Sequence, residues 1–132
     1  MATFEKVAGR TESKKYTLAG PVVAGSIVQG DEANGVVVHA TNKSALGIAL
    51  EGGTSGQRIL VEHLFPDSKV KATGVTATIV AGSVFQHVDV SAGTDITLTD
   101  TNKDALVIGW YGAATSALLT FKKIVFGSST LE

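Results

Sequence analysis

The sequence predicts an all-β protein: a compact, partly open β-barrel or β-clip-like domain built from two pseudo-repeated halves, with a flexible N-terminal arm. Three observations predict it. Two stretches recur along the chain in the same order. The 132 residues include 15 glycines but only 2 prolines, which is typical of many short strands joined by tight turns. No segment has a sustained helical period with capping residues.

The internal repeat is the strongest of these signals. Residues 22–29 (VVAGSIVQ) return as residues 79–86 (IVAGSVFQ), and residues 41–48 (TNKSALGI) return as residues 101–108 (TNKDALVI). The first pair is offset by 57 residues and the second by 60, so the later copy holds three additional residues between its blocks. Ordered echoes with one small length change indicate a duplicated unit.

We therefore interpret residues 22–65 and 79–126 as two copies of one β unit. Two copies are too few for a solenoid, which needs about three or more. A length of 132 residues also fits one domain, over residues 15–126, with a sizeable core.

Composition excludes several classes of function. The net charge of −1 gives no general attraction to nucleic acid, and no run approaches the length of a membrane span. There is no cysteine for a disulfide or a thiolate metal site, and the N-terminus lacks the apolar core of a secretory signal. The charged fraction is 17%, against roughly 25% for an ordinary domain. So few charges suit a Ser/Thr-rich surface or a surface covered in an assembly.

Residues 1–14 differ from the rest because they hold a dense share of the charge. We expect a flexible arm, either a frayed terminus without a role or a segment that becomes ordered on a partner, with Phe4 as its apolar anchor. The candidate partner-binding residues of this region are Thr3, Phe4, Lys6, Arg10, Lys14 and Lys15. At the other end, residues 127–132 form a loose tail in which Leu131-Glu132 is typical of a cloning remnant.

The first half contains four predicted strands, at residues 26–29, 36–38, 45–50 and 58–62. Asn34-Gly35 is a strong turn signal, and the β-branched run that follows it favours a strand. Residues 45–50 are apolar throughout, so both faces of that strand should be covered. The glycine-rich residues 52–56 close a hairpin onto the fourth strand.

The second half follows the same plan after the break at residues 65–68. Residues 70–80 are predicted as a strand with a kink near Gly74. The remaining predicted strands are 84–90, 95–99, 105–111 and 117–126. Trp110 and Tyr111 adjoin on one of them, so we expect one side chain in the core and the other at a subunit interface.

No catalytic, cofactor-binding or metal-binding residue is predicted. His39, His63 and His87 lack helical metal-ligand spacing, and a site formed by them across a barrel is less favoured than ordinary strand histidines. Residues 100–104 have the D-x-N-x-D opening of a calcium loop, but Ala105 and Tyr111 stand where that loop needs Gly and Glu. The glycine-rich residues 52–58 lack the Gly-Lys-Ser/Thr end of a phosphate loop, and Ser26 and Ser83 lie outside a nucleophile elbow.

The order of the apolar blocks carries a family resemblance. Residues 23–28 followed by 45–52 resemble the first half of phage capsid decoration (cement) proteins. Residues 81–86, 95–99, 105–110 and 118–122 resemble the second half. Residues 107–122, in which a Gly-containing strand, a small-residue loop and a Thr-Phe strand occur in series, also resemble the head decoration protein of lambda-like phages. The charged residues 1–15 depart from the Thr-, Ser- and Pro-rich arm of that protein.

This resemblance implies a compact β domain, without catalytic residues or cofactors, that sits on the capsid exterior after synthesis in the host cytoplasm. It implies the major capsid protein as partner, a homotrimer as the assembled form, and no binding to nucleic acid or membrane. Two other functions remain open from the residues. One is a β module that binds carbohydrate or another protein, and the other is a small enzyme, which is disfavoured because no paired titratable groups occur at useful spacing.

Overall fold

The computed structural model describes residues 2–31, 35–40, 43–99 and 101–126. Within these ranges the chain forms eleven β-strands and one 3-10 turn. The elements are β1 (Thr3–Ala8), β2 (Ser13–Thr17), β3 (Ile27–Asp31), β4 (Gly35–Val38), β5 (Gly47–Ala49), β6 (Arg58–His63), β7 (Lys69–Thr73), η1 (Ala81–Ser83), β8 (His87–Ser91), β9 (Asp95–Thr97), β10 (Ala105–Gly109) and β11 (Ser116–Phe121). No helix in the described ranges has the length and apolar character to cross a membrane.

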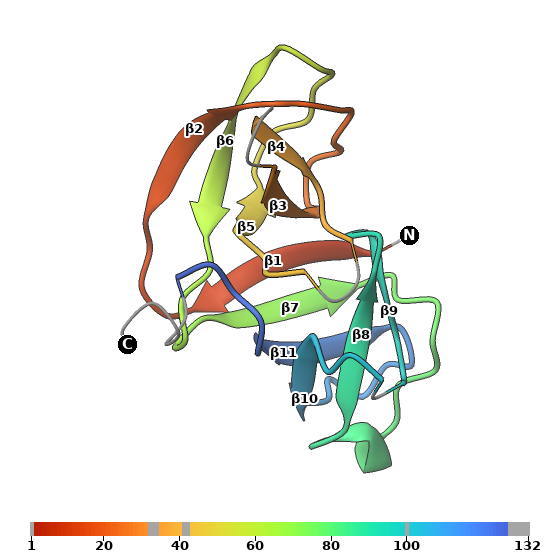
Figure 1. Ribbon diagram of the computed structural model, residues 1–132. Helices are drawn as coiled ribbons and strands as arrows, with labels where there is room; N and C mark the ends of the chain where they lie inside the picture. The colour runs from red at the N-terminus through yellow and green to blue at the C-terminus, as the bar shows by residue number, and fades with distance from the viewer. Residues whose placement is uncertain (1, 32–34, 41–42, 100, 127–132) are drawn as a thin grey trace.

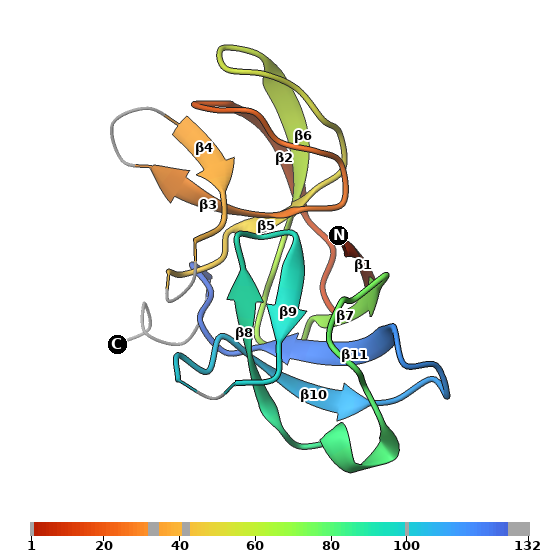
Figure 2. The same cartoon turned by 90° about the vertical axis from the view of Figure 1, so that its right-hand side faces the viewer.

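The strands form two antiparallel sheets, which confirms the predicted all-β class, although neither sheet closes into a barrel. The first sheet has the order β2-β6-β5-β3-β4, and the second has the order β1-β7-β11-β10-β8-β9. The first sheet lies above the second in the views of Figures 1 and 2. It curls until Leu18, which follows β2, forms a single parallel bridge with Val36 of β4.

The strand order of the first sheet recurs in the second. β2-β6-β5-β3-β4 corresponds to β7-β11-β10-β8-β9, strand for strand and in the same order along the chain. The sequence echoes therefore fall on equivalent parts of the two sheets. β1 adds to the outer edge of β7, and no described strand of the first sheet corresponds to it.

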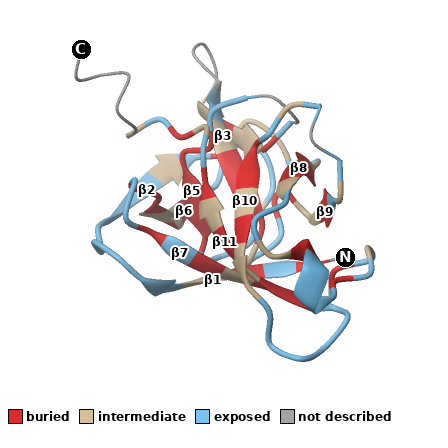
Figure 3. Ribbon diagram, turned by 90° about the horizontal axis from the view of Figure 1, so that it is seen from below, coloured by how far each residue is buried: buried red, intermediate tan, exposed pale blue. Residues whose placement is uncertain are grey.

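The halves share a hydrophobic core. One buried cluster joins Ile27 and Ile48 of the first sheet to Val70 and Leu119 of the second, and a smaller cluster around Val61 fills the first sheet alone. In Figure 3 the buried segments lie on strands of both sheets, whereas the outer loops are mostly exposed. Burying such side chains contributes roughly 1.5–3 kcal/mol each, so separating the halves would expose much of the stabilising surface.

Residues 1–14 are not a flexible arm in the part that the structure describes. Thr3–Ala8 forms β1, which pairs antiparallel with β7, and Ser13–Thr17 forms β2, which pairs with β6. Phe4 is 2% exposed and meets Phe121 edge-to-face, with 6.4 Å between ring centroids. The prediction missed β1 because few inward apolar residues alternate with its exposed charged ones. Phe4 is thus an anchor within this chain's own core.

Several strands are shorter than predicted. β8 begins at His87 instead of residue 84, because η1 and the positive φ of Phe85 (73°) delay the extended backbone. β7 ends at Thr73, just before the kink predicted at Gly74, and residues 75–80 form no strand. β10 ends at Gly109 and β11 at Phe121, so both finish before the limits that hydrophobicity suggested.

Candidate protein-binding surfaces

Exposed apolar side chains gather at one end of the second sheet. We call Val80, Phe85, Trp110 and Tyr111 the aromatic surface; their exposed fractions are 50%, 78%, 41% and 47%. They come from the segments flanking η1 and from the loop after β10, both of which lie in the lower right part of Figures 1 and 2. Backbone hydrogen bonds join these segments, including one from the Phe85 N–H to a β10 carbonyl at 2.7 Å. Large exposed apolar side chains on neighbouring segments make this end of the sheet a candidate interaction site.

Phe85 is held in an unfavourable backbone conformation. Its φ of +73° lies in the left-handed region, which costs a residue with a side chain roughly 1–2 kcal/mol. Its N–H donates to the Val107 carbonyl, and the next carbonyl, of Gln86, accepts the Val107 N–H at 3.0 Å. These bonds fix the backbone while the ring remains in solvent. The sequence predicted a strand face here, whereas the structure presents Phe85 as an exposed ring.

Trp110 and Tyr111 are both exposed, so the prediction that one of them lies in the core is wrong. The alternation of a strand does not apply to them, because β10 ends at Gly109. Their rings nevertheless have partners: the Trp110 Nε1–H donates to the Ala113 carbonyl at 3.1 Å, and the Lys71 ammonium lies 4.6 Å from the Tyr111 ring centre. The rings are therefore partly oriented before any partner arrives.

The first half carries a smaller version of the aromatic surface. In the aligned echoes Val23 corresponds to Val80, and Leu50 corresponds to Trp110. Val23 and Leu50 are 55% and 45% exposed. Phe85 has no such counterpart. The first echo is offset by 57 residues, whereas β8 begins 60 residues after β3, so the three additional residues of the second half are residues 84–86, between η1 and β8.

The candidate residues of the N-terminal region separate into buried and exposed groups. The Lys6 side chain is only 3% exposed and lies 3.9 Å from the Glu62 carboxylate. Its ammonium donates to the carbonyls of Arg10 (2.6 Å) and His63 (2.5 Å). Burial lowers the pKa of Lys6, and the carboxylates of Glu62 and Asp67 oppose that shift. Lys6 is thus engaged within the chain.

Arg10 also has partners in the fold. Its guanidinium lies 4.5 Å from the Phe65 ring centre, and its backbone N–H donates to the Asp67 carboxylate. Thr3 is exposed on β1, where it neighbours the buried Phe4 but faces the other side of the strand. Lys14 and Lys15 are exposed on β2, at the edge of the first sheet.

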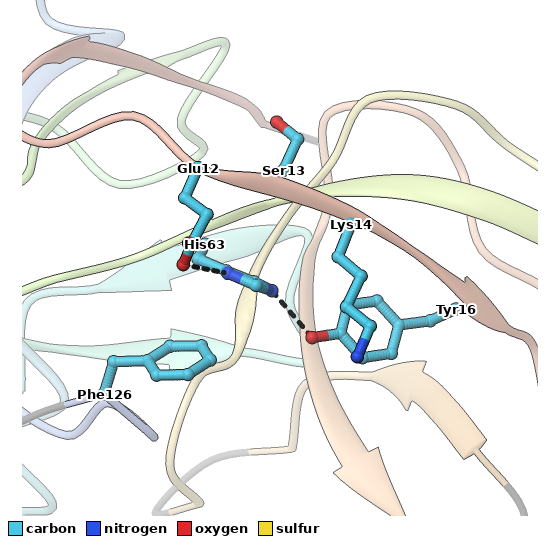
Figure 4. Close-up of a pocket in the computed structure, with 6 residues that line it drawn as sticks. All are labelled: Glu12, Ser13, Lys14, Tyr16, His63 and Phe126. Atoms are coloured by element: carbon cyan, nitrogen blue, oxygen red, sulfur yellow. Dashed lines mark hydrogen bonds and ion pairs between the residues drawn. The ribbon is translucent and has the colours of Figure 1, made fainter.

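A pocket of about 350 Å³ opens beside β2 and is shown in Figure 4. It is lined by Glu12, Ser13, Lys14, Tyr16, His63 and Phe126. The Tyr16 hydroxyl and His63 Nε2 are 2.7 Å apart, and His63 Nδ1 lies 3.3 Å from a Glu12 carboxylate oxygen. The Phe126 ring packs at a tilt against His63, with 4.5 Å between ring centroids. No sequence signal indicates this pocket, because its residues come from segments that are far apart in the chain.

The chemistry of the pocket suits the binding of a partner side chain. Burial raises the pKa of Tyr16, and the negative charge of Glu12 adds to this effect, so the hydroxyl keeps its proton at neutral pH. A protonated phenol is a hydrogen-bond donor and a poor nucleophile. Aromatic walls with polar groups at their rim instead suit an apolar side chain of a partner.

The other polar clusters stabilise loops. Asp89 accepts hydrogen bonds from the backbone N–H groups of Asn102 (3.0 Å) and Lys103 (3.1 Å), and Asp104 accepts from the Val90 N–H. Asp100 of the calcium-like motif lies outside the described residues. Within the described ranges, no three His, Asp or Glu side chains come together as metal ligands. Burial lowers the pKa of His39, whose Nε2 pairs with the Lys43 carbonyl at 2.7 Å.

Comparison with protein-family models finds no match, and comparison with curated proteins also finds none. Among solved structures, the chain is similar to the head fiber gp8.5 N base in bacteriophage phi29, with a TM-score of 0.60 and 14% sequence identity. The similarity covers 87% of this chain and 97% of that one. At this level of identity the comparison establishes a shared fold.

Proposed function

We propose that this chain is a structural virion protein that binds the outer surface of a phage capsid and stabilises the mature shell as a decoration, or cement, protein. The observation that carries the proposal is the fold shared with the base of a phage head fiber, over 97% of that chain. The order of apolar blocks in the sequence supports the same function by its resemblance to decoration proteins. The proposal assigns the chain no enzymatic activity.

The exposed residues suggest how such a protein would assemble. The aromatic surface would form the contact between subunits of a homotrimer, because exposed Trp and Tyr are enriched at interfaces. Lys14 and Lys15, on the edge strand β2, would contact the major capsid protein on the exterior of the virion. Many copies on a symmetric shell multiply a modest contact into a large stabilising effect.

Cosedimentation with capsid shells tests the proposal directly. The purified protein is mixed with expanded and with unexpanded shells of the phage whose genes neighbour its own. Saturable binding to expanded shells alone is the expected result, since maturation would create the binding site. Binding to neither kind of shell would refute the decoration function.

The subunit contact has a separate test. Trp110→Ser combined with Tyr111→Ser should convert a trimer into monomers in sedimentation equilibrium. Val23→Ser is the matched control, because it removes an exposed apolar side chain from the corresponding part of the first half. A protein that is monomeric before substitution, both in solution and on shells, would rule out the trimer.

The second candidate function is a β module that recognises carbohydrate or another protein. The exposed Phe85, Trp110 and Tyr111 favour it, because aromatic platforms stack on sugar rings and on protein side chains. A glycan array would show binding that Trp110→Ala abolishes. An array without binding would eliminate the carbohydrate form of this function.

A further inference from the structure

We infer that the exposed edge of β2 accepts an extended acidic segment of the partner protein as an additional antiparallel strand, with an aromatic side chain of that segment in the pocket beside Tyr16 and His63. The inference rests on the proposed function and deepens it by naming the kind of capsid segment that this chain would bind. Adding a strand to a sheet edge is a common mode of protein recognition.

The second sheet already contains the arrangement that we infer for the first. β2 and β7 hold the same place in the repeated strand order, and β1 covers the outer edge of β7 (Figure 1). In the first sheet β2 is itself the outermost strand. The duplicated framework therefore provides a strand-accepting edge twice, and among the described residues a strand of this chain covers only the edge on β7.

The registers of the two sheets show which residues correspond. Tyr16 lies opposite Ile59 on β6, as Ala72 lies opposite Ala117 on β11. By the same alignment Lys14 corresponds to Val70, and Lys15 corresponds to Lys71. On β1, Phe4 pairs with Ala72, Glu5 with Lys71 and Lys6 with Val70. A strand added to β2 would thus place its own residues opposite Tyr16, Lys15 and Lys14.

Part of the β2 edge is covered, and part is available. Near Thr17 the edge meets β4, where the Ala19 N–H donates to the Val36 carbonyl at 2.9 Å. The two backbones are so close that a Cβ added to Gly35 would lie 2.3 Å from the Thr17 carbonyl oxygen. Within the described residues, Ser13–Tyr16 pair with β6 alone. Four residues of edge therefore remain for a partner, and the pocket opens beside them.

The pocket occupies the place that a core aromatic fills in the second sheet. β6 aligns with β11 so that His63 corresponds to Phe121, the ring that Phe4 contacts. A partner residue opposite Tyr16 would face inward as Phe4 does, because directly opposed residues share a face of the sheet. In the first sheet that direction leads toward the pocket that Tyr16, His63 and Phe126 line. An aromatic or large apolar side chain fits these walls.

The positive charges of β2 favour acidic residues at the other positions of the partner segment. In the second sheet Glu5 and Lys71 occupy opposite positions in the register, so an acidic residue opposite Lys15 would repeat that placement of opposite charges. Lys14 replaces the apolar Val70 on the inward face, which adds a second positive charge beside the strand. Lysines on an edge strand discourage pairing with uncharged strands and so prevent aggregation. The same lysines make an acidic strand the favoured occupant.

The test uses a peptide based on the sequence of β1, acetyl-Phe-Glu-Glu-Val-Ala-amide, which keeps the Phe4 and Glu5 positions and replaces Lys6 with glutamate. It is titrated to millimolar concentration into the full-length, isotope-labelled protein, and backbone amide shifts are followed by NMR. We expect saturable shifts that concentrate on residues 13–16, 63 and 126. Lys14→Glu combined with Lys15→Glu should weaken binding at least fivefold. The matched control is Lys69→Glu combined with Lys122→Glu, which reverses two exposed lysine charges outside β2 and should leave binding unchanged.

The peptide acetyl-Phe-Lys-Lys-Val-Ala-amide is the specificity control and should bind at least fivefold more weakly. Equal binding of both peptides, or no shifts on β2 at millimolar concentration, would overturn the inference. Spectra of the free variants verify that their folds are intact. Because the titration contains no shells, it separates the two proposals: peptide binding without shell binding would refute only the decoration function. Shell binding that survives reversal of both lysine charges would overturn the β2 edge as the capsid contact.

Discussion

Replacing Phe85 with glycine should weaken partner binding without destabilising the fold. The ring is 78% exposed, so its removal takes little buried surface from the protein. The backbone at this residue has a φ of +73°, a conformation that glycine adopts without steric cost. Folding and binding should therefore respond in opposite directions to Phe85→Gly.

The magnitude follows from two opposing contributions. Relief of the left-handed conformation contributes about 1–2 kcal/mol of stability. The greater freedom of glycine in the unfolded chain costs roughly 0.5–1 kcal/mol. The net expectation is a gain of about 0.5 kcal/mol. With a urea m-value of about 2 kcal/mol/M for a domain of this size, the midpoint would rise by about 0.25 M.

The assay is urea denaturation of Phe85→Gly and unsubstituted protein, followed by circular dichroism and paired with binding measurements. Ala92→Gly is the matched control, since Ala92 also has a positive φ (51°) and is exposed. Both variants should show the same small gain in stability. Phe85→Gly alone should weaken subunit or shell association, by about tenfold or more if the ring is an interface hot spot.

A loss of stability would refute this reasoning. If Phe85 packed against the fold, removing it would cost about 3–5 kcal/mol, as for a buried phenylalanine, and the midpoint would fall by more than about 1.5 M. A variant that keeps full stability and full association would instead remove Phe85 from the interaction surface.

Three further predictions concern the framework. Gly93→Ala should lower the free energy of unfolding by about 3 kcal/mol or more in urea denaturation, because φ is +69° and a Cβ would lie 2.3 Å from the Ile27 carbonyl oxygen. The control Gly56→Ala, at φ +91° with open space around it, should cost about 1 kcal/mol. Equal losses in the two variants would exclude a close contact at Gly93. Asp89→Asn should cost about 1–3 kcal/mol and speed hydrogen exchange of the loop amides that the carboxylate holds, whereas unchanged exchange would mean that the loop is held otherwise. Because burial lowers the pKa of His39 in the folded state, stability should be complete above the unfolded value of about 6.5 and decline as pH falls below it. His39→Gln should flatten that decline, and an undiminished slope would assign it to other groups.

The all-β class was predictable because its signals are local. Short β-branched runs between glycine-rich turns specify strands, and the ordered echoes indicated a repeated unit. The N-terminal region was not predictable in the same way. β1 buries Phe4 against a strand that is distant in sequence, and its local pattern is dominated by exposed charges. Its pairing with β7 depends on tertiary structure that the local pattern does not record.

The candidate surfaces were visible in the sequence only in part. Trp110 and Tyr111 were found as an aromatic pair, but their exposure depends on β10 ending at Gly109, just before them. Phe85 was not found, because the first echo aligns it with Val28 and the change of offset from 57 to 60 places the extra residues after Gln86. The pocket could not have been found, since the approach of Glu12 and Tyr16 to His63 follows no sequence spacing.

Comparison of the two halves separates what the fold requires from what it does not. Gln29 and Asp89 lie at corresponding positions on β3 and β8, and each accepts a hydrogen bond from a loop N–H, so this contact belongs to the framework. The same framework folds with Leu50 in the first half where the second half has Trp110. The exposed Trp110 ring contributes little to the fold itself. The same holds for the exposed Phe85 ring, which the added residues hold in an unfavourable backbone conformation. Residues that differ between the halves without stabilising the fold are the ones expected to serve binding of a partner. Substitutions in the aromatic surface and on the β2 edge therefore test partner binding most directly.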